Sequence, residues 1–421
     1  MKTEHTSKNI LFFVESYHYK PNANGICAKI LADELIRRSS HVTVLATKTF
    51  HRQCSSEKVD GVDVFYFSRS MGHRLLLLSD DLNGIAKKII LYLSKCFMYF
   101  GVILGAFVWP LRKPALIYKY YNKAKKLYKQ KKIDVAVGIY FGIEEVLASI
   151  LLKRKHPDIK LIIYTLDALT GRETPILFGS KVLAKRSIEK WEKYIYSKAD
   201  TVCVMESHRA HYKQKKYDQI RNKIKYMDIP FMNIRKEISY SDKKNGKVKI
   251  VYTGNTSRIT GSPGYLIKML KYMPDLSLYL YGTQDEFVKQ LIKESGLMNK
   301  QIYIFGRFDN KEIMKIQETA DFLVSFGSAN SCMVPCKIFE YMTALKPIIS
   351  FYKSDKDAAY PYISRYPDSI LIKEDEEAFE DNLLLLKNFI YNTKRKTITN
   401  EFLLEKYGAN TPNFMVEEIL S

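Results

Sequence analysis

Short, continuous runs of β-branched and other apolar residues recur along the whole chain, and they restrict its fold more than any other feature. The runs in the first half are Ile10–Val14, Val42–Ala46, Val62–Phe67, Val135–Ile139, Leu161–Thr165 and Thr201–Met205. The runs in the second half are Lys249–Tyr252, Ser277–Tyr281, Ile302–Phe305, Phe322–Ser325, Ile348–Phe351 and Ile370–Lys373. Each run is continuous rather than alternating, which is typical of strands buried on both faces of a parallel sheet.

The stretches between these runs have helical character. In Asn24–Arg38, between the first two runs, the apolar residues recur at helical spacing: Ile26, Ile30, Leu31 and Leu35. A strand, a glycine-containing loop and a helix in this order begin a βαβ unit. The chain has 421 residues, which is too long for one average domain. The sequence therefore predicts an α/β fold of two facing Rossmann-like, doubly wound domains.

The polar stretch Asn233–Lys247 separates the two halves and is the best candidate for a linker. We expect one domain over residues 1–235, a second over residues 236–400, and a terminal helix over residues 401–421 that returns to the first domain. The run Ile10–Val14 is too short for the apolar core of a signal peptide, and it is interpreted as a first buried strand.

An apolar and basic insertion over residues 85–132 interrupts the pattern. Ile85–Leu111 is dense in apolar residues, but Lys87, Lys88 and Lys95 interrupt it. Its charge-free part, Cys96–Leu111, is shorter than the uninterrupted span of about 20 that crosses a membrane. Between Arg74 and Lys132, thirteen Lys or Arg residues stand against two acids. An apolar face beside a basic face is typical of a helix in an anionic membrane surface, and Trp109 suits such an interface. The alternative is a buried helix whose neighbours carry solvated basic faces.

The charged residues and the cysteines narrow the possible partners. Lys and Arg outnumber Asp and Glu by 67 to 45, so the net charge of +22 predicts a negatively charged partner or surface. No RNP, helix-turn-helix or zinc pattern is present, and nucleic acid is not expected. The six cysteines form no C-x-x-C pair and have no histidine cluster beside them, so we predict no metal site and reduced thiols in a cytosol.

The stretch Asn330–Ser350, NSCMVPCKIFEYMTALKPIIS, carries the most specific chemistry. It lies between two predicted strands, and Pro335 is expected as the first helical residue. Free amides at the start of that helix, with Ser331, Met333 and Val334 before it, would form an anion site. Lys337 adds a positive charge, and the carboxylate of Glu340, one turn further on, could accept hydrogen bonds from the two hydroxyls of a ribose.

This stretch resembles a motif of GT-B glycosyltransferases. P-C-K-I-F-E-Y-M-T-A-L-K-P-I-I is similar to the P-x-K-x-x-E-Y-M-A-x-G-K-P-I segment of the large retaining family 4-like enzymes that build bacterial surface polysaccharides. The resemblance implies that Glu340 binds the ribose of the donor nucleotide. Many members carry a second Glu eight positions earlier, where this chain has Cys332, so Ser331 or a backbone amide would have to contact the donor sugar. The alternative is an ordinary βαβ helix.

Two further loops of the second half fit the same resemblance. In Val251–Gly264, VYTGNTSRITGSPG, Gly254 would allow close approach of the backbone and Arg258 would neutralise the donor diphosphate. The usual Lys-Gly of this loop is replaced, so Lys337 would supply the second positive charge. Gly306 and Arg307, after Tyr303, are expected beside the nucleobase, although a plain strand end is the alternative.

In the first half, three places are candidates for the acceptor side of the site. Asn24 and Gly25, in the loop PNANG after the first strand, resemble the glycine-bearing loop of GT-B enzymes near the acceptor. Asp167 follows the run Leu161–Thr165 at the edge where open α/β sheets bind ligands. Asp167 could contact the acceptor hydroxyl, or it could be a turn or helix-cap residue. His18 is a further catalytic candidate.

The sequence therefore predicts transfer of a glycosyl unit from a nucleoside-diphosphate sugar. By resemblance the anomeric configuration is retained and no metal or other cofactor is needed. The basic and apolar insertion suggests that the acceptor is a glycan or a lipid-linked intermediate at a membrane. We expect a cytoplasmic protein, peripheral on the inner face of the plasma membrane. The alternatives are a nucleotide-sugar epimerase of the same fold, a non-catalytic GT-B subunit and a nucleic-acid-binding protein.

Overall fold

The computed structural model describes residues 7–19, 21–107, 110–111, 113–171, 181–232, 247–258, 261–327, 334–355 and 357–421. The chain forms two compact units. The first unit comprises Met1–Pro230 and Pro412–Ser421, and the second comprises Phe231–Thr411. The predicted linker at residues 233–247 lies outside the described residues, apart from Lys247.

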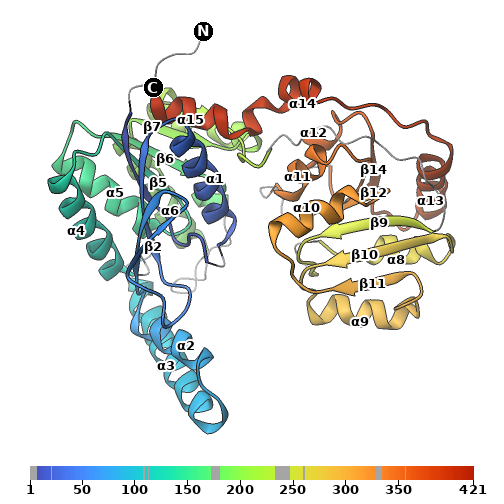
Figure 1. Cartoon of the computed structure of the whole chain (residues 1–421), viewed down its shortest axis with the longest axis horizontal. Helices are drawn as coiled ribbons and strands as arrows, with labels where there is room; N and C mark the ends of the chain where they lie inside the picture. The colour runs from blue at the N-terminus through green and yellow to red at the C-terminus, as the bar shows by residue number, and fades with distance from the viewer. Residues whose placement is uncertain are drawn as a thin grey trace. The chain divides into compact units, whose positions relative to one another are not determined.

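The first unit is built on an eight-stranded sheet in the order β3-β4-β2-β1-β5-β6-β7-β8 (Figure 1). Neighbouring strands are parallel except for β3 and β4, which are antiparallel. The strands are β1 (Asn9–Phe13), β2 (His41–Thr47), β3 (Ser56–Val59), β4 (Val62–Phe67), β5 (Val135–Ile139), β6 (Lys160–Thr165), β7 (Thr201–Val204) and β8 (Ile224–Tyr226). The helices are α1 (Ala23–Arg37), α2 (Met71–Asp80), α3 (Gly84–Phe107), α4 (Pro114–Gln130), α5 (Ile143–Lys155), α6 (Lys181–Lys198), α7 (Arg209–Tyr212) and α15 (Pro412–Leu420).

The second unit has a six-stranded, fully parallel sheet in the order β11-β10-β9-β12-β13-β14. Its strands are β9 (Val248–Thr253), β10 (Leu276–Tyr281), β11 (Ile302–Phe305), β12 (Phe322–Phe326), β13 (Ile348–Tyr352) and β14 (Ser369–Lys373). Its helices are α8 (Gly264–Leu270), α9 (Glu286–Ser295), α10 (Asn310–Glu318), α11 (Lys337–Thr343), α12 (Tyr360–Ile363), α13 (Phe379–Lys387) and α14 (Asn400–Tyr407). Because the strands are parallel, the loops after them meet at one carboxyl edge, where such sheets bind ligands.

All twelve predicted strands are present, and each end lies within one residue of the expected position. Two described strands were not predicted. β3 has the sequence SEKV and pairs only as the edge strand of the sheet, so it needs no apolar run. β8 has three residues, which is too short to give a pattern.

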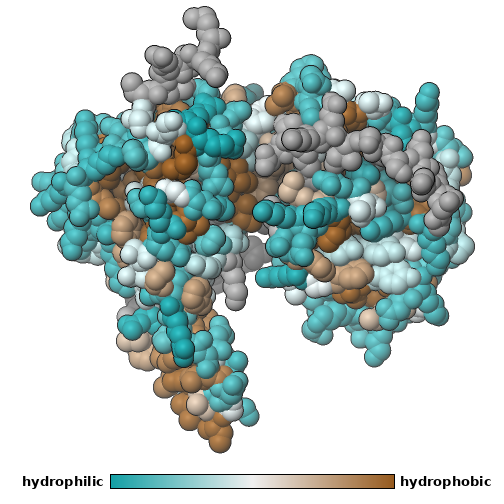
Figure 2. All heavy atoms as spheres, in the orientation of Figure 1, coloured by the Kyte–Doolittle hydropathy of each residue, from teal (hydrophilic) through white to brown (hydrophobic). Residues whose placement is uncertain are grey.

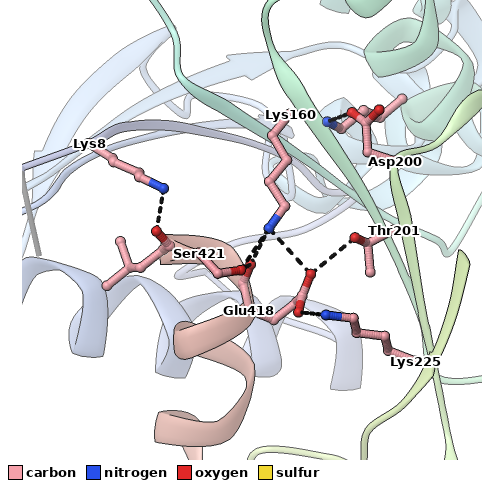
Figure 3. Close-up of polar contacts among 9 residues, drawn as sticks. Lys8, Lys160, Asp200, Thr201, Lys225, Glu418 and Ser421 are labelled. Atoms are coloured by element: carbon pink, nitrogen blue, oxygen red, sulfur yellow. Dashed lines mark hydrogen bonds and ion pairs between the residues drawn. The ribbon is translucent and has the colours of Figure 1, made fainter. Parts of the chain in front are cut away.

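The C-terminal helix α15 packs on α1 and belongs to the first unit, whereas α14 belongs to the second. Glu418 of α15 lies among polar groups from the starts of three strands (Figure 3). Its carboxylate accepts hydrogen bonds from Lys160 at 3.3 Å, Thr201 at 3.0 Å, and Lys225. The amino end of the first sheet is therefore closed by the last residues of the chain.

Helices α2 and α3 form a hairpin that extends away from the sheet of the first unit (Figure 1). Ser94 Oγ donates to the carbonyl oxygen of Gly72 at 2.8 Å, which joins the two helices. Many outward side chains of α3 are apolar and exposed, including Ile85 (77%), Tyr92 (69%) and Tyr99 (75%). Apolar atoms gather over the hairpin in Figure 2. The alternative of a helix buried in the core is therefore wrong for this segment.

Candidate functional site

Glu340 lies on α11 beside the last residue of β9. Its Oε2 atom accepts from Lys337 Nζ at 2.8 Å and from Gln317 Nε2 at 3.3 Å. Gln317, on α10, also donates to Thr253 Oγ1 at 3.0 Å, and the hydroxyl of Tyr341 accepts from the amide of Thr253 at 2.9 Å. These contacts fix the carboxylate at the carboxyl edge of the sheet. Within the described part of the chain, the Oε1 atom of Glu340 has no hydrogen-bond donor and can serve a ligand.

The helix that carries Glu340 begins later than the sequence suggested. Pro335 was expected as the first helical residue, but α11 begins at Lys337 with Cys336 as its N-cap. Pro335 instead accepts the amide of Ile338 in a tight turn, at 3.2 Å. Val334 is buried, whereas Ser331, Cys332 and Met333 lie outside the described residues.

Leu345 ends this segment with a left-handed backbone, φ 55°. It occupies the position at which the resembling motif has glycine, the residue that adopts such a φ without strain. The backbone of this turn therefore keeps the shape that the motif encodes, although the glycine itself is absent.

The loops after β9, β10 and β11 are joined at the same edge. The amide of Gly254 donates to the carbonyl oxygen of Tyr281 at 2.7 Å, and Gly282 donates to Gly306 at 3.1 Å. Gly282 has φ 128°, and a Cβ there would collide with the carbonyl oxygen of Gly254. Glycine is therefore required at Gly282 by the close approach of two backbones.

Arg258 and Arg307 occupy different parts of this edge. The amide of Arg258 donates to Asp285 Oδ2 at 3.0 Å, and its exposed guanidinium lies 5.4 Å from the ring centroid of Phe287 on α9. Arg307 donates from Nε to Thr283 Oγ1 at 3.2 Å. Within the described residues, neither arginine forms a hydrogen bond or an ion pair with Glu340 or Lys337. A ligand in contact with all four side chains would therefore have to extend along the ends of several strands.

In the first unit, the loop after β1 is tied to the end of β5. Asn24 is buried and donates from Nδ2 to the carbonyl oxygen of Tyr140 at 3.1 Å. The amide of Gly25 donates to Asn22 Oδ1 at 2.9 Å, the N-cap of α1, and a Cβ at Gly25 would collide with the carbonyl oxygen of Ser16. Both residues therefore shape this loop, and the amide of Gly25 already has a partner.

The two catalytic candidates of the first unit are not joined by a recorded contact among the described residues. Asp167 follows β6, and its carbonyl oxygen accepts from Thr165 Oγ1. His18 has φ 55°, and its ring lies edge-on to Tyr19 with centroids 4.6 Å apart. Only Asp167 is therefore placed directly after a central strand.

Sequence reasoning missed Gln317, the amide that contacts both Glu340 and the end of β9. Gln317 is fully buried on an otherwise amphipathic helix. A long polar side chain on the inward face of a helix is the signal that could have identified it. In the described part of the chain, no group of three or more His, Cys, Asp or Glu side chains is arranged to hold a metal ion.

The sequence matches no protein-family model and no curated protein. Solved structures do resemble the chain. Anabaena HepE in complex with UDP and glucose has a TM-score of 0.54 at 13% identity, over 98% of this chain and 96% of that chain. WaaG, a glycosyltransferase involved in lipopolysaccharide biosynthesis, has a TM-score of 0.55 at 11% identity, over 97% and 99%. A Listeria monocytogenes protein described as a UDP-N-acetylglucosamine 2-epimerase has a TM-score of 0.53 at 10% identity, over 99% and 95%.

These likenesses cover almost the whole of each chain and establish the two-unit GT-B fold, with Rossmann-like units. At 10–13% identity these likenesses are evidence for the fold alone, and the function has to be inferred from the site.

Proposed function

We propose that the chain is a glycosyltransferase that takes a sugar from a nucleoside-diphosphate donor. The observation that carries the proposal is the carboxylate of Glu340, held by Lys337 and Gln317 at the carboxyl edge of a parallel sheet. A fixed carboxylate with one open oxygen suits the two hydroxyls of a ribose. The likeness to HepE, which was solved with UDP and glucose, supports a uridine nucleotide as the first donor to try.

The remaining donor contacts follow from charge. Lys337 lies beside Glu340, and Arg258 carries an exposed guanidinium in the loop after β9. Positive charge favours the departure of a nucleoside diphosphate, because it stabilises the negative charge that develops there. Ser331 and the amides of Met333 and Val334 are proposed for the phosphate and sugar, and Gly306 and Arg307 for the base. We further propose a retaining reaction that needs no metal.

Replacement of Glu340 by Gln tests the proposal directly. Gln keeps the shape but donates where the carboxylate accepts, so we expect affinity for UDP to fall by about tenfold or more. Calorimetry on the full chain with UDP, ADP and GDP measures this, with Glu377→Gln, an exposed glutamate of the same unit, as the control. Equal affinity of the Glu340→Gln and parent proteins for every nucleotide would refute the assignment.

A nucleotide-sugar epimerase is the second candidate, because one of the similar folds is described as such an enzyme. The two activities differ in what they need. An epimerase converts the donor sugar without an acceptor, whereas a transferase releases nucleoside diphosphate when an acceptor is present. Product analysis after incubation with UDP-N-acetylglucosamine alone separates them, and a new sugar epimer in that mixture would favour the epimerase. A non-catalytic subunit would give neither product.

We propose that the acceptor is a lipid-linked glycan on an anionic membrane surface and that the α2–α3 hairpin contacts this surface. The residues at positions 85, 89, 92, 99 and 103 recur at helical spacing along α3, and all of them are apolar and exposed. None of the helices in the described part of the chain combines the length and the apolar composition of a membrane span. A helix with this composition suits a position within the lipid headgroups.

The charges around the hairpin favour anionic lipid over another protein surface. Lys88 and Lys95 are exposed and, being seven residues apart, lie on one side of α3. The following helix, α4, carries five lysines and no acidic residue. Basic residues beside an embedded apolar face each strengthen attraction to anionic headgroups. We therefore propose that the protein works at the cytoplasmic face of a membrane.

Vesicle binding tests this second part of the proposal. The full chain should co-sediment with vesicles containing phosphatidylglycerol at low salt, and binding should fall as salt is raised. Replacing Tyr92 and Tyr99 by Ser should reduce binding about fivefold or more, whereas Leu384→Ser, an exposed leucine of the second unit, should not. If the parent protein ignores these vesicles, or instead forms dimers that the double variant loses, the membrane assignment is wrong.

A further inference from the structure

A cavity of about 190 Å³ lies within the first unit, at the carboxyl edge of its sheet. One water molecule needs about 15 Å³ by a comparable measure, so the cavity can hold a ligand of roughly a dozen heavy atoms. Its charged lining comes from four separate parts of the chain: Glu15, Arg69, Lys113, Glu144 and Glu145.

Most of these charged groups already have partners. Arg69 pairs with Glu15 at 2.6 Å, and Glu15 also accepts from Asn22 at 2.8 Å. Glu144 Oε1 accepts the backbone amide of Lys113 at 2.6 Å. Glu145 differs from these carboxylates. Only 2% of the residue is exposed, and its Oε2 atom has no hydrogen-bond partner within the described part of the chain. A buried carboxyl oxygen without a donor is costly, which points to a ligand at this place.

Glu144 and Glu145 both turn back over Gly142 at the start of α5. An Oε2 atom from each lies 2.9 Å from the place where a Cβ of Gly142 would stand. A side chain at position 142 would therefore displace both carboxylates. Burial, followed by the charges of Glu144 and Glu15, raises the pKa of Glu145 to about 7, although Lys113 opposes the shift. Near neutral pH this carboxyl group can both donate and accept a hydrogen bond.

The balance of charge indicates the class of ligand. Among the described residues of the lining, two cations face three carboxyl groups, so they carry no net positive charge, although the whole chain carries +22. A phosphate or other anion would meet three acidic side chains. A neutral ligand with several hydroxyls would instead find donors and acceptors on all sides. Phe141 is 37% exposed and adds an apolar ring to the lining, a mixture usual in small-molecule sites.

We propose that this cavity binds one saccharide unit of the acceptor, with Glu145 and Lys113 contacting its hydroxyls. That this saccharide belongs to an acceptor rests on the proposed function, whereas the binding of a neutral sugar in the cavity does not. Lys113 is half-buried, and its ammonium group lies within the electrostatic reach of Glu15, Glu144 and Glu145. It can therefore orient a hydroxyl toward Glu145.

Saturation-transfer NMR on the full chain tests the site. The probes are the methyl glycosides of glucose, galactose, mannose, N-acetylglucosamine and rhamnose, each without a nucleotide. We expect at least one glycoside to give transfer signals that fall about tenfold or more in Glu145→Leu and in Lys113→Met. Both replacements keep the approximate side-chain volume, and leucine removes a buried polar group without a full set of partners.

Matched controls separate a lost site from a lost fold. Lys155→Met removes a lysine from the far end of α5 and should keep the parental signals. The affinity for UDP, measured on the same samples, reports independently whether the second unit binds a nucleotide. Sugar signals with no nucleotide binding would leave the cavity assigned and refute the donor site. The cavity proposal is overturned if no glycoside binds the parent, if the signals persist in Glu145→Leu, or if inorganic phosphate displaces the sugar.

Discussion

At the residue scale, three glutamates of this chain differ in how their carboxylates are satisfied. Glu192 is fully enclosed and accepts from the amide of Leu169 at 3.0 Å and from Tyr217 at 2.5 Å, among other donors. Such a carboxylate stabilises the fold. Glu340 and Glu145 each keep an oxygen without a donor among the described residues. Burial without a partner raises the free energy of the empty protein, so a ligand that donates to Glu145 would stabilise it. Glu340 is less buried, and its open oxygen is available to a ligand.

The stability of the protein should depend on Glu145 in a defined pH window. Its pKa is 4.5 in the unfolded reference and about 7 in the fold, so the folded state binds the proton more tightly. Stability is therefore lost as pH rises from 4.5 through 7, by up to about 3 kcal/mol at 1.4 kcal/mol per pKa unit. Glu145→Gln should remove this loss and stabilise the protein more at pH 8 than at pH 5. Urea unfolding followed by tryptophan fluorescence measures it, since Trp109 and Trp191 both belong to the first unit. An equal effect at both pH values would contradict the assigned pKa.

Leu345 should tolerate glycine better than valine. Glycine relieves the left-handed backbone at φ 55° but loses side-chain contacts, so Leu345→Gly should change stability by less than about 1 kcal/mol. Leu345→Val places a β-branched side chain at positive φ and should cost about 2 kcal/mol. Thermal melting followed by circular dichroism distinguishes the two, with Leu384→Val on α13 as control. Valine tolerated as well as glycine at position 345 would argue against strain at this turn.

At the scale of elements, α15 is held by specific charges as well as by packing. Lys160 donates to the carbonyl oxygen of Glu418 at 2.6 Å and to Ser421 Oγ at 3.0 Å, in addition to the Glu418 carboxylate. Arg38 of the loop after α1 reaches Asn413 at 3.1 Å and also Glu417. A short helix of nine residues would not persist alone, so these contacts and the α1 interface account for its place.

Loss of the Glu418 carboxylate should destabilise the first unit. Glu418→Ala leaves Lys160 and Lys225 without their shared partner, which should cost about 1–3 kcal/mol at pH 7. Burial tends to raise the pKa of Glu418, but Lys225, Lys160 and Thr201 lower it below the usual value. Its contribution is therefore present above about pH 4.5 and is lost as pH falls through the lowered pKa. Urea unfolding should give a larger difference from the parent at pH 7 than in acid, and exposed Glu405→Ala should give none. A difference that grows in acid would reverse the assigned sign.

At the scale of the whole molecule, the proposed binding sites belong to two different sheets. The second unit carries the proposed donor residues at the ends of β9, β11 and β12, and the first unit carries the acidic cavity and the apolar hairpin. The net charge of +22 is unevenly distributed, because α4 carries five lysines and no acid, whereas the described lining of the cavity has no excess of positive charge. Anionic surfaces and neutral sugars can thus be bound by different parts of one unit.

Nucleotide binding should protect the second unit in a definite pattern. We expect UDP to slow amide hydrogen exchange most in residues 254–258 and 337–340, because these flank the carboxyl edge around Glu340. Exchange in β3 and β4 should change least. Mass spectrometry of peptides from the full chain, with Glu340→Gln as the reference, measures this. Protection strongest in β3 and β4 would place the nucleotide elsewhere.

The sequence alone determined which elements form. The strands are encoded locally, because a buried parallel strand requires a continuous apolar run, and each predicted run became a strand within one residue. Glu340 and Lys337 were also predicted from the sequence as donor-site residues, because they lie three residues apart in one motif, and the structure pairs their side chains. The polar edge strand β3 and the start of α11 were not predicted, because pairing and turn geometry rather than local composition decide them.

Only the tertiary structure decided what surrounds these residues. Gln317 reaches Glu340 across 23 positions of sequence, and Glu418 meets Lys160 across 258. Glu15, Arg69, Lys113 and Glu145 come together because strand ends far apart in the chain share one edge of a sheet. Whether α3 is buried or exposed also depended on what packs against it. Local composition selects helices and strands, but burial and the pairing of charges are set by contacts between distant segments, which no local pattern contains.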